Sequence, residues 1–339
     1  MSASPATHAD IAVLGAGSWG TALAIQCARA GRCARLWGRN RAHMEIMARE
    51  RVNRRYLPGA VFPDSLHLVS DLGAAIQGVE DVLLAVPSHG FRELLHELRS
   101  RLPPAARLCW ATKGFEQGTG LLPNQIAHAV LGSGRQVAVL SGPTFASEVG
   151  AGLPSAMTIA SAETDYAEKL ARDLSSATFR AYTSTDITGV EVGGAVKNVL
   201  AIGAGLSDGL GFGANTRIAL ITRGLVEMTR LGVALGARRE TFMGLAGLGD
   251  LVLTCTDDHS RNRRFGLALG QGTAVQAALR NIGQVVEGYP AALALHGVAA
   301  REAVPMPIAE GIFGVLYEQL PAAQLVHGLM LRPIRPEFD

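Results

Sequence analysis

The stretch Ile11-Ala12-Val13-Leu14-Gly15-Ala16-Gly17-Ser18-Trp19-Gly20 is an apolar run followed by a GxGxxG motif. The run predicts a buried strand, and the pattern of Thr21–Ala30 predicts a helix that ends at Gly31. Glycines at this spacing permit a tight turn, close approach of a pyrophosphate to the backbone, and close packing of helix and strand. The N-terminus of the helix offers unpaired N–H groups to phosphate. The stretch therefore predicts a dinucleotide-binding site.

The first half of the chain repeats this plan, and the second half does not. Short apolar runs alternate with helical patterns at residues 34–37, 82–86, 108–112, 137–140, 156–160 and 179–182. Such runs are typical of a parallel sheet covered on both faces. After Asp186 long helical periodicities take over, at residues 190–205, 216–231 and 291–301. We expect an α/β fold: a Rossmann-type doubly wound sheet over residues 1–188, then an all-α domain over residues 189–339.

Composition excludes several classes of protein. The 339 residues are 48% apolar, enough for two cores, and the net charge is +2. A nearly neutral chain has no bulk electrostatic reason to bind nucleic acid or an anionic membrane. The polar segment Met1–Asp10 has no signal-peptide pattern, and neither the cysteines nor the histidines show metal-binding spacing. We therefore expect a cytoplasmic protein with no membrane insertion, no nucleic-acid partner and no metal.

The end of the second predicted strand bears on the choice of cofactor. A site specific for NAD usually has Asp or Glu there, to bind the ribose hydroxyls. This strand ends Leu36-Trp37-Gly38-Arg39-Asn40, without an acid. Arg39 can neutralise the 2′-phosphate of NADP, although a solvated surface arginine is the alternative. The sequence favours NADP over NAD.

Two lysines occupy unusual positions. Lys113 follows the apolar run 108–112, and ligands bind at the carboxyl ends of strands in open parallel sheets. Lys197 lies within Glu191–Leu200, a helical stretch of small and apolar residues. Burying an unpaired ammonium is costly and lowers its pKa, which suits proton transfer. A lysine that extends to solvent from the edge of the helix is the alternative.

Three later motifs carry further polar groups. Gly247–Thr254 places Asp250 and Thr254 four residues apart, on one helical face. Ser260-Arg261-Asn262 is a run of three polar groups that can hold a phosphate, and Val285–Gly288 contains the acid Glu287. Taken by itself, each of these motifs more often lies on the surface or caps a helix than forms a binding site.

Taken together, the motifs resemble the bacterial NAD(P)-dependent glycerol-3-phosphate dehydrogenase family. The matching stretches run in order over about residues 10–320, and they are Gly15–Ala24, Lys113-Gly114, Ser141–Ala146, Glu191–Leu200, Gly247–Thr254, Ser260–Asn262 and Val285–Gly288. The resemblance implies reversible hydride transfer between NAD(P)H and dihydroxyacetone phosphate, which supplies glycerol 3-phosphate for phospholipid synthesis. It also implies a homodimer as one option.

The resemblance implies a role for each matching residue. Lys197 corresponds to the group that exchanges the proton, with Lys113 and Asp250 as the other catalytic residues. The implied substrate-binding residues are Lys113, Gly142, Thr144, Lys197, Asp250, Ser260, Arg261 and Asn262. The implied cofactor-binding residues are Gly15, Gly17, Ser18, Trp19, Gly20, Arg39, Lys113, Ala146, Arg261, Val285 and Glu287.

Two other functions are compatible with the same architecture. A hydroxyacid or 6-phosphogluconate dehydrogenase shares the front domain and a lysine in a helical back domain. The Gly247–Thr254 and Ser260–Asn262 motifs favour the glycerol-3-phosphate enzyme instead. A non-enzymatic NADPH sensor is disfavoured because Lys113, Lys197 and Asp250 are all present.

Overall fold

The computed structural model describes residues 10–325 and divides into two compact units. The first unit comprises the chain up to Lys113 together with Leu122–Glu191. The second comprises Gly114–Leu121 and the chain from Val192 onward. Residues 1–9, on which the expected location partly rests, lie outside the described residues.

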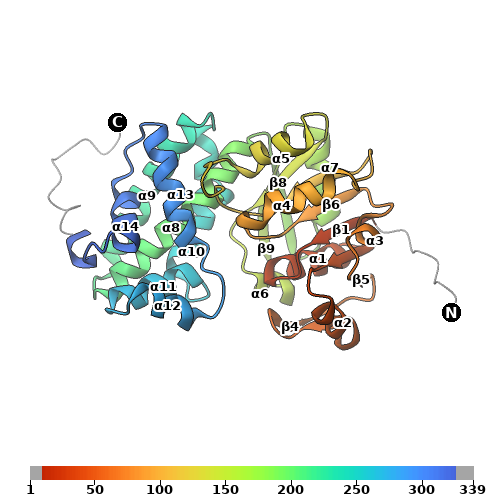
Figure 1. Ribbon diagram of the computed structural model, residues 1–339, viewed down its shortest axis with the longest axis horizontal. Helices are drawn as coiled ribbons and strands as arrows, with labels where there is room; N and C mark the ends of the chain where they lie inside the picture. Colours follow the sequence, from red (N-terminus) through yellow and green to blue (C-terminus); the bar gives the residue numbers. More distant parts are fainter. Residues whose placement is uncertain (1–9, 326–339) are drawn as a thin grey trace. The chain divides into compact units, whose positions relative to one another are not determined.

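The first unit is built on an eight-stranded sheet (Figure 1). Its order is β10-β9-β8-β7-β6-β1-β2-β5. The strands are β1 (Ile11–Leu14), β2 (Ala34–Trp37), β5 (Leu66–Val69), β6 (Asp81–Leu84), β7 (Arg107–Trp110), β8 (Val137–Ser141), β9 (Ser155–Ala160) and β10 (Phe179–Ser184). β1, β2, β6 and β8 are buried along their whole length, as continuous apolar runs predict.

The sheet is parallel, as expected, at every pairing except the one between β8 and β9. β9 pairs antiparallel with β8, and β10 then pairs parallel with β9. An antiparallel neighbour needs no crossover between opposite edges of the sheet. The connection from β8 to β9, which contains the short helix α6 (Ala146–Ala151), accordingly starts at the carboxyl end of β8 and enters β9 at that same end of the strands.

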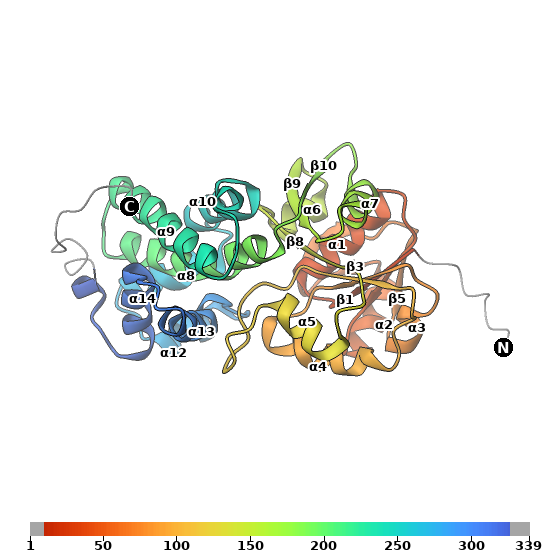
Figure 2. The same ribbon diagram turned by 90° about the horizontal axis from the view of Figure 1, so that it is seen from above.

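Helices cover both faces of this sheet. α1 (Ser18–Arg29) contacts α6 and α7 (Thr164–Leu174) on one face, and α4 (Ser88–Arg99) contacts α5 (Pro123–Leu131) on the other (Figure 2). The remaining elements of the unit are α2 (Arg41–Glu50), α3 (Leu72–Ile76) and a hairpin of β3 (Val52–Asn53) and β4 (Leu57–Val61). The described part of this unit is therefore a doubly wound α/β domain.

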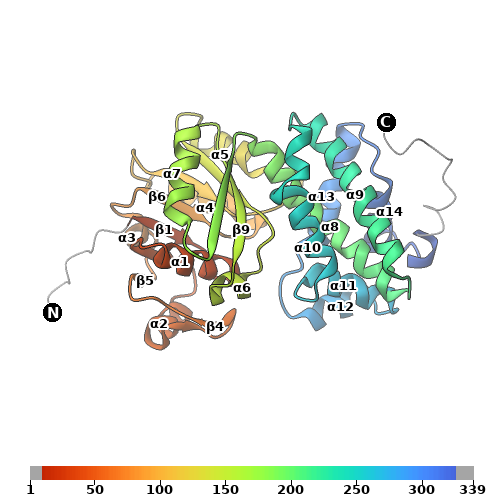
Figure 3. The same cartoon turned by 180° about the vertical axis from the view of Figure 1, so that it is seen from behind.

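The described part of the second unit contains helices and no strand, as the periodicity after Asp186 predicts (Figure 3). Its helices are α8 (Ile187–Gly209, which begins in the first unit), α9 (Ala214–Ala234), α10 (Asp250–Thr256), α11 (Arg261–Gly270), α12 (Val275–Ile282), α13 (Gly288–Arg301) and α14 (Pro307–Tyr317). A 3₁₀ turn (Arg239–Met243) and a π-helical segment (Leu245–Gly249) precede α10.

α8 is the core helix of the second unit. Within residues 10–325 it is the one helix long and apolar enough to cross a membrane, yet 89% of its apolar window is buried inside the protein. Close contacts link α8 to α9 through Leu200 and Gly224, and to α14 through Gly203 and Ile312. Its apolar character is therefore explained by packing against other helices.

α8 and α11 pack backbone against backbone. Gly205 and Gly209 on α8 face Gly266 and Gly270 on α11. A Cβ added at Gly205 would lie 1.9 Å from the carbonyl oxygen of Arg263, and one added at Gly266 would lie 2.0 Å from that of Ile202. Because glycines four residues apart share a helix face, the two pairs let the helices approach more closely than side chains would allow.

We expect Gly266→Ala to lower the free energy of unfolding by about 3 kcal/mol, because its methyl group would meet a backbone carbonyl that has no room to move. Gly297→Ala is the matched control. Gly297 lies inside α13 with no atom within 4 Å of an added Cβ, so this variant should gain about 0.5–1 kcal/mol of helix propensity. Urea unfolding followed by circular dichroism measures both, and similar values for the two variants would contradict the packing argument.

Candidate active site

The turn between β1 and α1 has the geometry that its glycines predict. Gly15 has a φ of +127°, and an added Cβ would lie 2.5 Å from the carbonyl oxygen of Ala85. An added Cβ at Gly20 would lie 1.8 Å from the carbonyl oxygen of Gly15, so the helix packs closely on the turn itself. An added Cβ at Gly17 meets nothing within 4 Å. The space beside Gly17 at the start of α1 is therefore open, as phosphate binding at a helix N-terminus requires.

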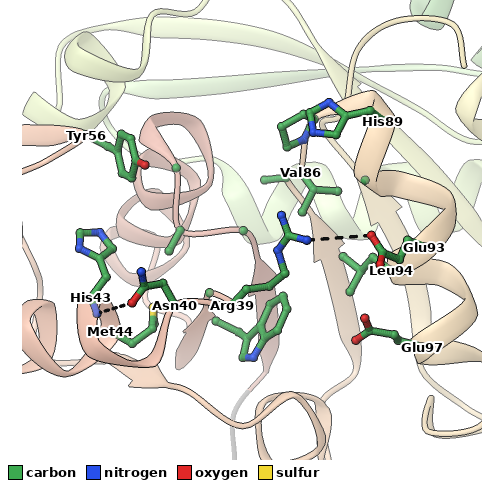
Figure 4. Close-up of a pocket in the computed structure, with 18 of the residues that line it drawn as sticks. Arg39, Asn40, His43, Met44, Tyr56, Val86, His89, Glu93, Leu94 and Glu97 are labelled. Atoms are coloured by element: carbon green, nitrogen blue, oxygen red, sulfur yellow. Dashed lines mark hydrogen bonds and ion pairs between the residues drawn. The ribbon is translucent and has the colours of Figure 1, made fainter. Parts of the chain in front are cut away.

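A cavity of about 310 Å³ adjoins this turn (Figure 4). It is lined by the turn, by the end of β2 with Arg39 and Asn40, by His43 on α2, and by the start of α4. Its position beyond the carboxyl ends of β1, β2 and β6 is where open parallel sheets bind nucleotides. The glycine turn and the cavity together fit the pyrophosphate and adenosine parts of a dinucleotide.

Three more predicted residues of the first unit also lie just beyond the carboxyl ends of strands. Lys113 follows β7 and is half-buried, and Gly142 and Thr144 follow β8, the neighbour of β7. An added Cβ at Gly142 would lie 2.8 Å from the Cα of Met157 on β9. This contact gives Gly142 a structural reason to be glycine. Ala146 begins α6 and packs against the apolar core.

Trp19 and Ser18 belong to the first turn of α1. Ser18 is the first residue of the helix, and the Trp19 ring packs against the core of the unit. The indole N–H of Trp19 is buried and has no hydrogen-bond partner within residues 10–325. A buried donor without a partner is costly, and an atom closed to solvent cannot contact a ligand in this conformation. Trp19 does not line the cavity beside the glycine turn, so its part in cofactor binding stays a prediction.

Glu191 is a buried acid whose role the sequence did not reveal. Its carboxylate accepts hydrogen bonds from the Trp110 indole at 2.8 Å and from the backbone and side-chain amides of Asn124 at 3.0 and 2.7 Å. Burial raises its pKa to about 8, and the hydrogen bonds from Trp110 and Asn124 oppose that rise. Trp110 is the last residue of β7, three before Lys113. Glu191 thus ties the strand that leads to Lys113 to the first turns of α8.

The second unit holds Lys197 in a fixed position. Its side chain is 9% exposed, and its Nζ donates to Oδ1 of Asp250 at 2.5 Å and to Oγ1 of Thr254 at 3.0 Å. Asp250 and Thr254 lie one turn apart on α10, on the same face. The expected proximity of Asp250 to Lys197 is therefore present. A buried ammonium with one carboxylate and one hydroxyl as partners has little freedom to move.

Glycines allow this close approach. An added Cβ at Gly193, one turn before Lys197 on α8, would lie 2.3 Å from the carbonyl oxygen of Ala246 in the π-helical segment. An added Cβ at Gly247 would lie 2.2 Å from the carbonyl oxygen of Phe242. The backbone contact between α8 and the π-helical segment places Asp250 within reach of Lys197.

A second polar network, adjacent to Lys197 in sequence, contains Asn198, Asn262 and Glu287. Asn262 donates to Asn198 at 2.9 Å, and Asn198 donates to Glu287 at 3.4 Å. The backbone N–H of Gly288 donates to the side-chain Oδ1 of Asn262 at 2.9 Å. The structure thus brings two predicted residues together through Asn198, which sequence reasoning missed. Asn198, like Lys197, is a buried polar side chain in an otherwise apolar helix, and the same pattern could have predicted its role.

The predicted phosphate-binding run lies at the start of α11. Ser260 is the N-cap of this helix, and its hydroxyl accepts from the N–H of Arg263 at 3.2 Å. Arg261 is the first helical residue and is partly exposed. The helix N-terminus and the Arg261 guanidinium together favour an anion. Val285 is 49% exposed and precedes the turn that contains Glu287.

Within residues 10–325, no group of three or more His, Cys, Asp or Glu side chains is arranged to hold a metal ion.

Known proteins match both units. Residues 10–167 match the family described as NAD-dependent glycerol-3-phosphate dehydrogenase N-terminus, and residues 186–327 match its C-terminus. A glycerol-3-phosphate dehydrogenase, NAD(P)+, of Aeromonas salmonicida (strain A449) is 54% identical over 96% of this chain and 98% of its own length. One of Yersinia pestis (strain Pestoides F) is 56% identical over 91% of each chain. The crystal structure of the Coxiella burnetii enzyme is 46% identical, with a TM-score of 0.92 over 97% of this chain and 100% of that one.

Proposed function

This chain belongs to the NAD-dependent glycerol-3-phosphate dehydrogenase family, and on that premise we propose how its residues carry out the reaction. The protein is an oxidoreductase that interconverts dihydroxyacetone phosphate and sn-glycerol 3-phosphate with NAD(P)H, a step that supplies phospholipid synthesis. The observation that carries the proposed mechanism is the buried Lys197–Asp250–Thr254 cluster. Relatives more than half identical over nearly the whole chain favour this reaction over hydroxyacid or 6-phosphogluconate chemistry.

Lys197 is the proposed acid–base group. Reduction of a ketone creates an alkoxide that needs a proton, and oxidation of the alcohol needs a base. The ammonium of Lys197 donates this proton in one direction, and the amine accepts it in the other. Asp250 and Thr254 orient Nζ, while the positive charge of Lys113 stabilises the developing oxyanion. The hydrogen bonds of Lys197 support its part in this scheme.

The phosphate of the substrate is proposed to bind at the start of α11. Arg261 provides charge-assisted hydrogen bonds to it, and the helix N-terminus adds a favourable dipole. The hydroxyl of Ser260 caps the helix and so keeps its first turn in place. The amide of Asn262 is fixed by Asn198 and Gly288. Gly142 and Thr144 complete the proposed set of substrate-binding residues.

The cofactor is NADP or NAD. Gly15, Gly17, Ser18, Trp19 and Gly20 are proposed to hold its pyrophosphate, and Arg39 its adenosine end. Lys113, Ala146, Arg261, Val285 and Glu287 are proposed as its further contacts. When bound, the reduced nicotinamide supplies the hydride for the carbonyl carbon. The protein residues bind and orient both reactants and manage the proton.

The proposed function is tested by a steady-state assay of the full chain with dihydroxyacetone phosphate and either NADPH or NADH. We expect oxidation of the cofactor that depends on dihydroxyacetone phosphate. Hydroxyacids and 6-phosphogluconate, tested in the reverse direction with oxidised cofactor, are the competing substrates. A higher kcat/KM on either of them than on glycerol 3-phosphate would overturn the proposal.

Arg39→Asp is expected to raise the Kd of NADPH far more than that of NADH, because it replaces a partner of the 2′-phosphate with a repelling charge. A change of about a hundredfold for NADPH corresponds to the loss of one charge-assisted contact. Titration of cofactor fluorescence measures both constants. If both cofactors weaken equally, Arg39 has no part in recognising the 2′-phosphate.

We propose that the enzyme works in the cytoplasm, without membrane insertion and without nucleic-acid partners. A homodimer is an option that the family resemblance alone supports, and light scattering in solution would test it.

A further inference from the structure

Two acids line the cavity next to the glycine turn. Glu93 and Glu97 lie one turn apart on α4, and both line the cavity that Arg39 also lines. Figure 4 shows the Arg39 side chain extending toward Glu93, and the two groups form an ion pair at 4.0 Å. The side chains of Arg39 and Glu93 are 76% and 70% exposed, so both are accessible to a ligand.

Glu93 and Glu97 lie on a different element from the one that usually supplies an acid to the ribose of NAD. An acid at the end of β2 would accept hydrogen bonds from the ribose hydroxyls of NAD, and β2 ends without one. α4 begins four residues after β6 and supplies Glu93 and Glu97 to the same cavity. A local motif at β2 cannot reveal a carboxylate contributed by another element.

We propose that Glu93 is a selectivity residue that disfavours NADPH relative to NADH, an inference that rests on the proposed function. Its carboxylate acts in two ways. It pairs with Arg39, the group expected to meet the 2′-phosphate, so that phosphate binding must displace it. It also places a negative charge beside a dianion. A 2′-hydroxyl has no such conflict, because a hydroxyl can donate a hydrogen bond to a carboxylate.

The other charged groups of the cavity balance this effect. Arg39 follows β2 and Arg55 lies in the turn between β3 and β4, whereas Glu93 and Glu97 lie on α4. A cavity with cations on one side and carboxylates on the other contains partners for a phosphate and for ribose hydroxyls. This arrangement accounts for an enzyme that accepts both cofactors.

The test is the change in cofactor selectivity on Glu93→Gln, measured in the full chain without substrate. Titration gives the Kd values of NADPH and NADH, and their ratio is the readout. Removing one charge near the phosphate should shift the ratio toward NADPH by about three- to tenfold. The shift should shrink in 0.5 M salt, because salt screens exposed charges. An effect through altered structure would not depend on salt in this way.

Glu168→Gln is the matched control. Glu168 is an exposed acid on α7 that also pairs with an arginine, Arg172 at 3.5 Å, and it does not line the cavity. The Glu168→Gln variant removes the same charge as Glu93→Gln, and we expect it to leave the ratio of the NADPH and NADH Kd values unchanged. An unchanged ratio in Glu93→Gln, or an equal shift in the control, overturns the inference.

The measurement separates this inference from the proposed function. If the wild-type chain binds both cofactors and Glu93→Gln leaves the ratio unchanged, only the inference fails. If the wild-type chain binds neither cofactor, the proposed function fails and the inference fails with it.

Discussion

Lys197→Met is expected to lower kcat by roughly two to four orders of magnitude, the range for loss of a positioned acid–base group. Methionine keeps the length and apolar stem of lysine but carries no proton. NADPH binding should stay close to normal, because the glycine turn and its cavity contain no residue of α8. Steady-state kinetics with dihydroxyacetone phosphate and a cofactor titration measure the two effects separately.

Loss of Lys197 also has a cost in stability that its sequence context does not show. Replacing a buried lysine by an apolar residue removes a buried charge, but it also removes the partner of Asp250. Asp250 is only 1% exposed, so Lys197→Met leaves a buried carboxylate without its cation. Breaking such a pair costs about 3–5 kcal/mol.

The double variant Lys197→Met/Asp250→Asn therefore serves as the control for stability. It removes both charges and should recover most of the lost stability while kcat stays low. If Lys197→Met retains more than about a tenth of the wild-type kcat, proton transfer belongs to another group, and Lys113 is the first candidate.

The sequence predicted the elements of the fold well where a pattern is local. β1 and β2 have the predicted bounds, because each is a run of apolar residues buried on both faces. The direction of β9 was not predictable in this way, since an apolar run contains no information about which way the strand runs. The β3–β4 hairpin was missed because β3 has only two residues and β4 includes Pro58 and Gly59.

In the candidate site, too, the contacts between residues close in sequence were predictable and the long-range contacts were not. The nearness of Asp250 and Thr254 to each other follows from helical spacing. The partners of Glu191 lie 67 and 81 residues away, and the bond between Asn198 and Glu287 spans 89 residues. No local pattern predicts such contacts, and the fold alone creates them. Ser260 shows the opposite case, because its hydroxyl serves as a helix cap, which is the commonest role of a serine before a helix.

Arg261→Ala is expected to lower kcat/KM for dihydroxyacetone phosphate by about a hundredfold or more, the effect of losing a charge-assisted contact to a dianion. The same variant should change the much weaker activity on unphosphorylated dihydroxyacetone only slightly. Binding of a remote phosphate can also assist the chemical step, so part of the loss should appear in kcat. Steady-state kinetics on both substrates provide the comparison.

Arg264→Ala is the matched control for this prediction. Arg264 lies on the same helix as Arg261, three residues further on, and is exposed. Both variants remove one positive charge from α11, but only Arg261 occupies the first position, where the helix N-terminus also favours an anion. A general electrostatic effect would lower kcat/KM equally in the two variants. A loss confined to Arg261→Ala and to the phosphorylated substrate would place the phosphate at the start of α11, whereas an equal loss on both substrates would remove Arg261 from phosphate binding.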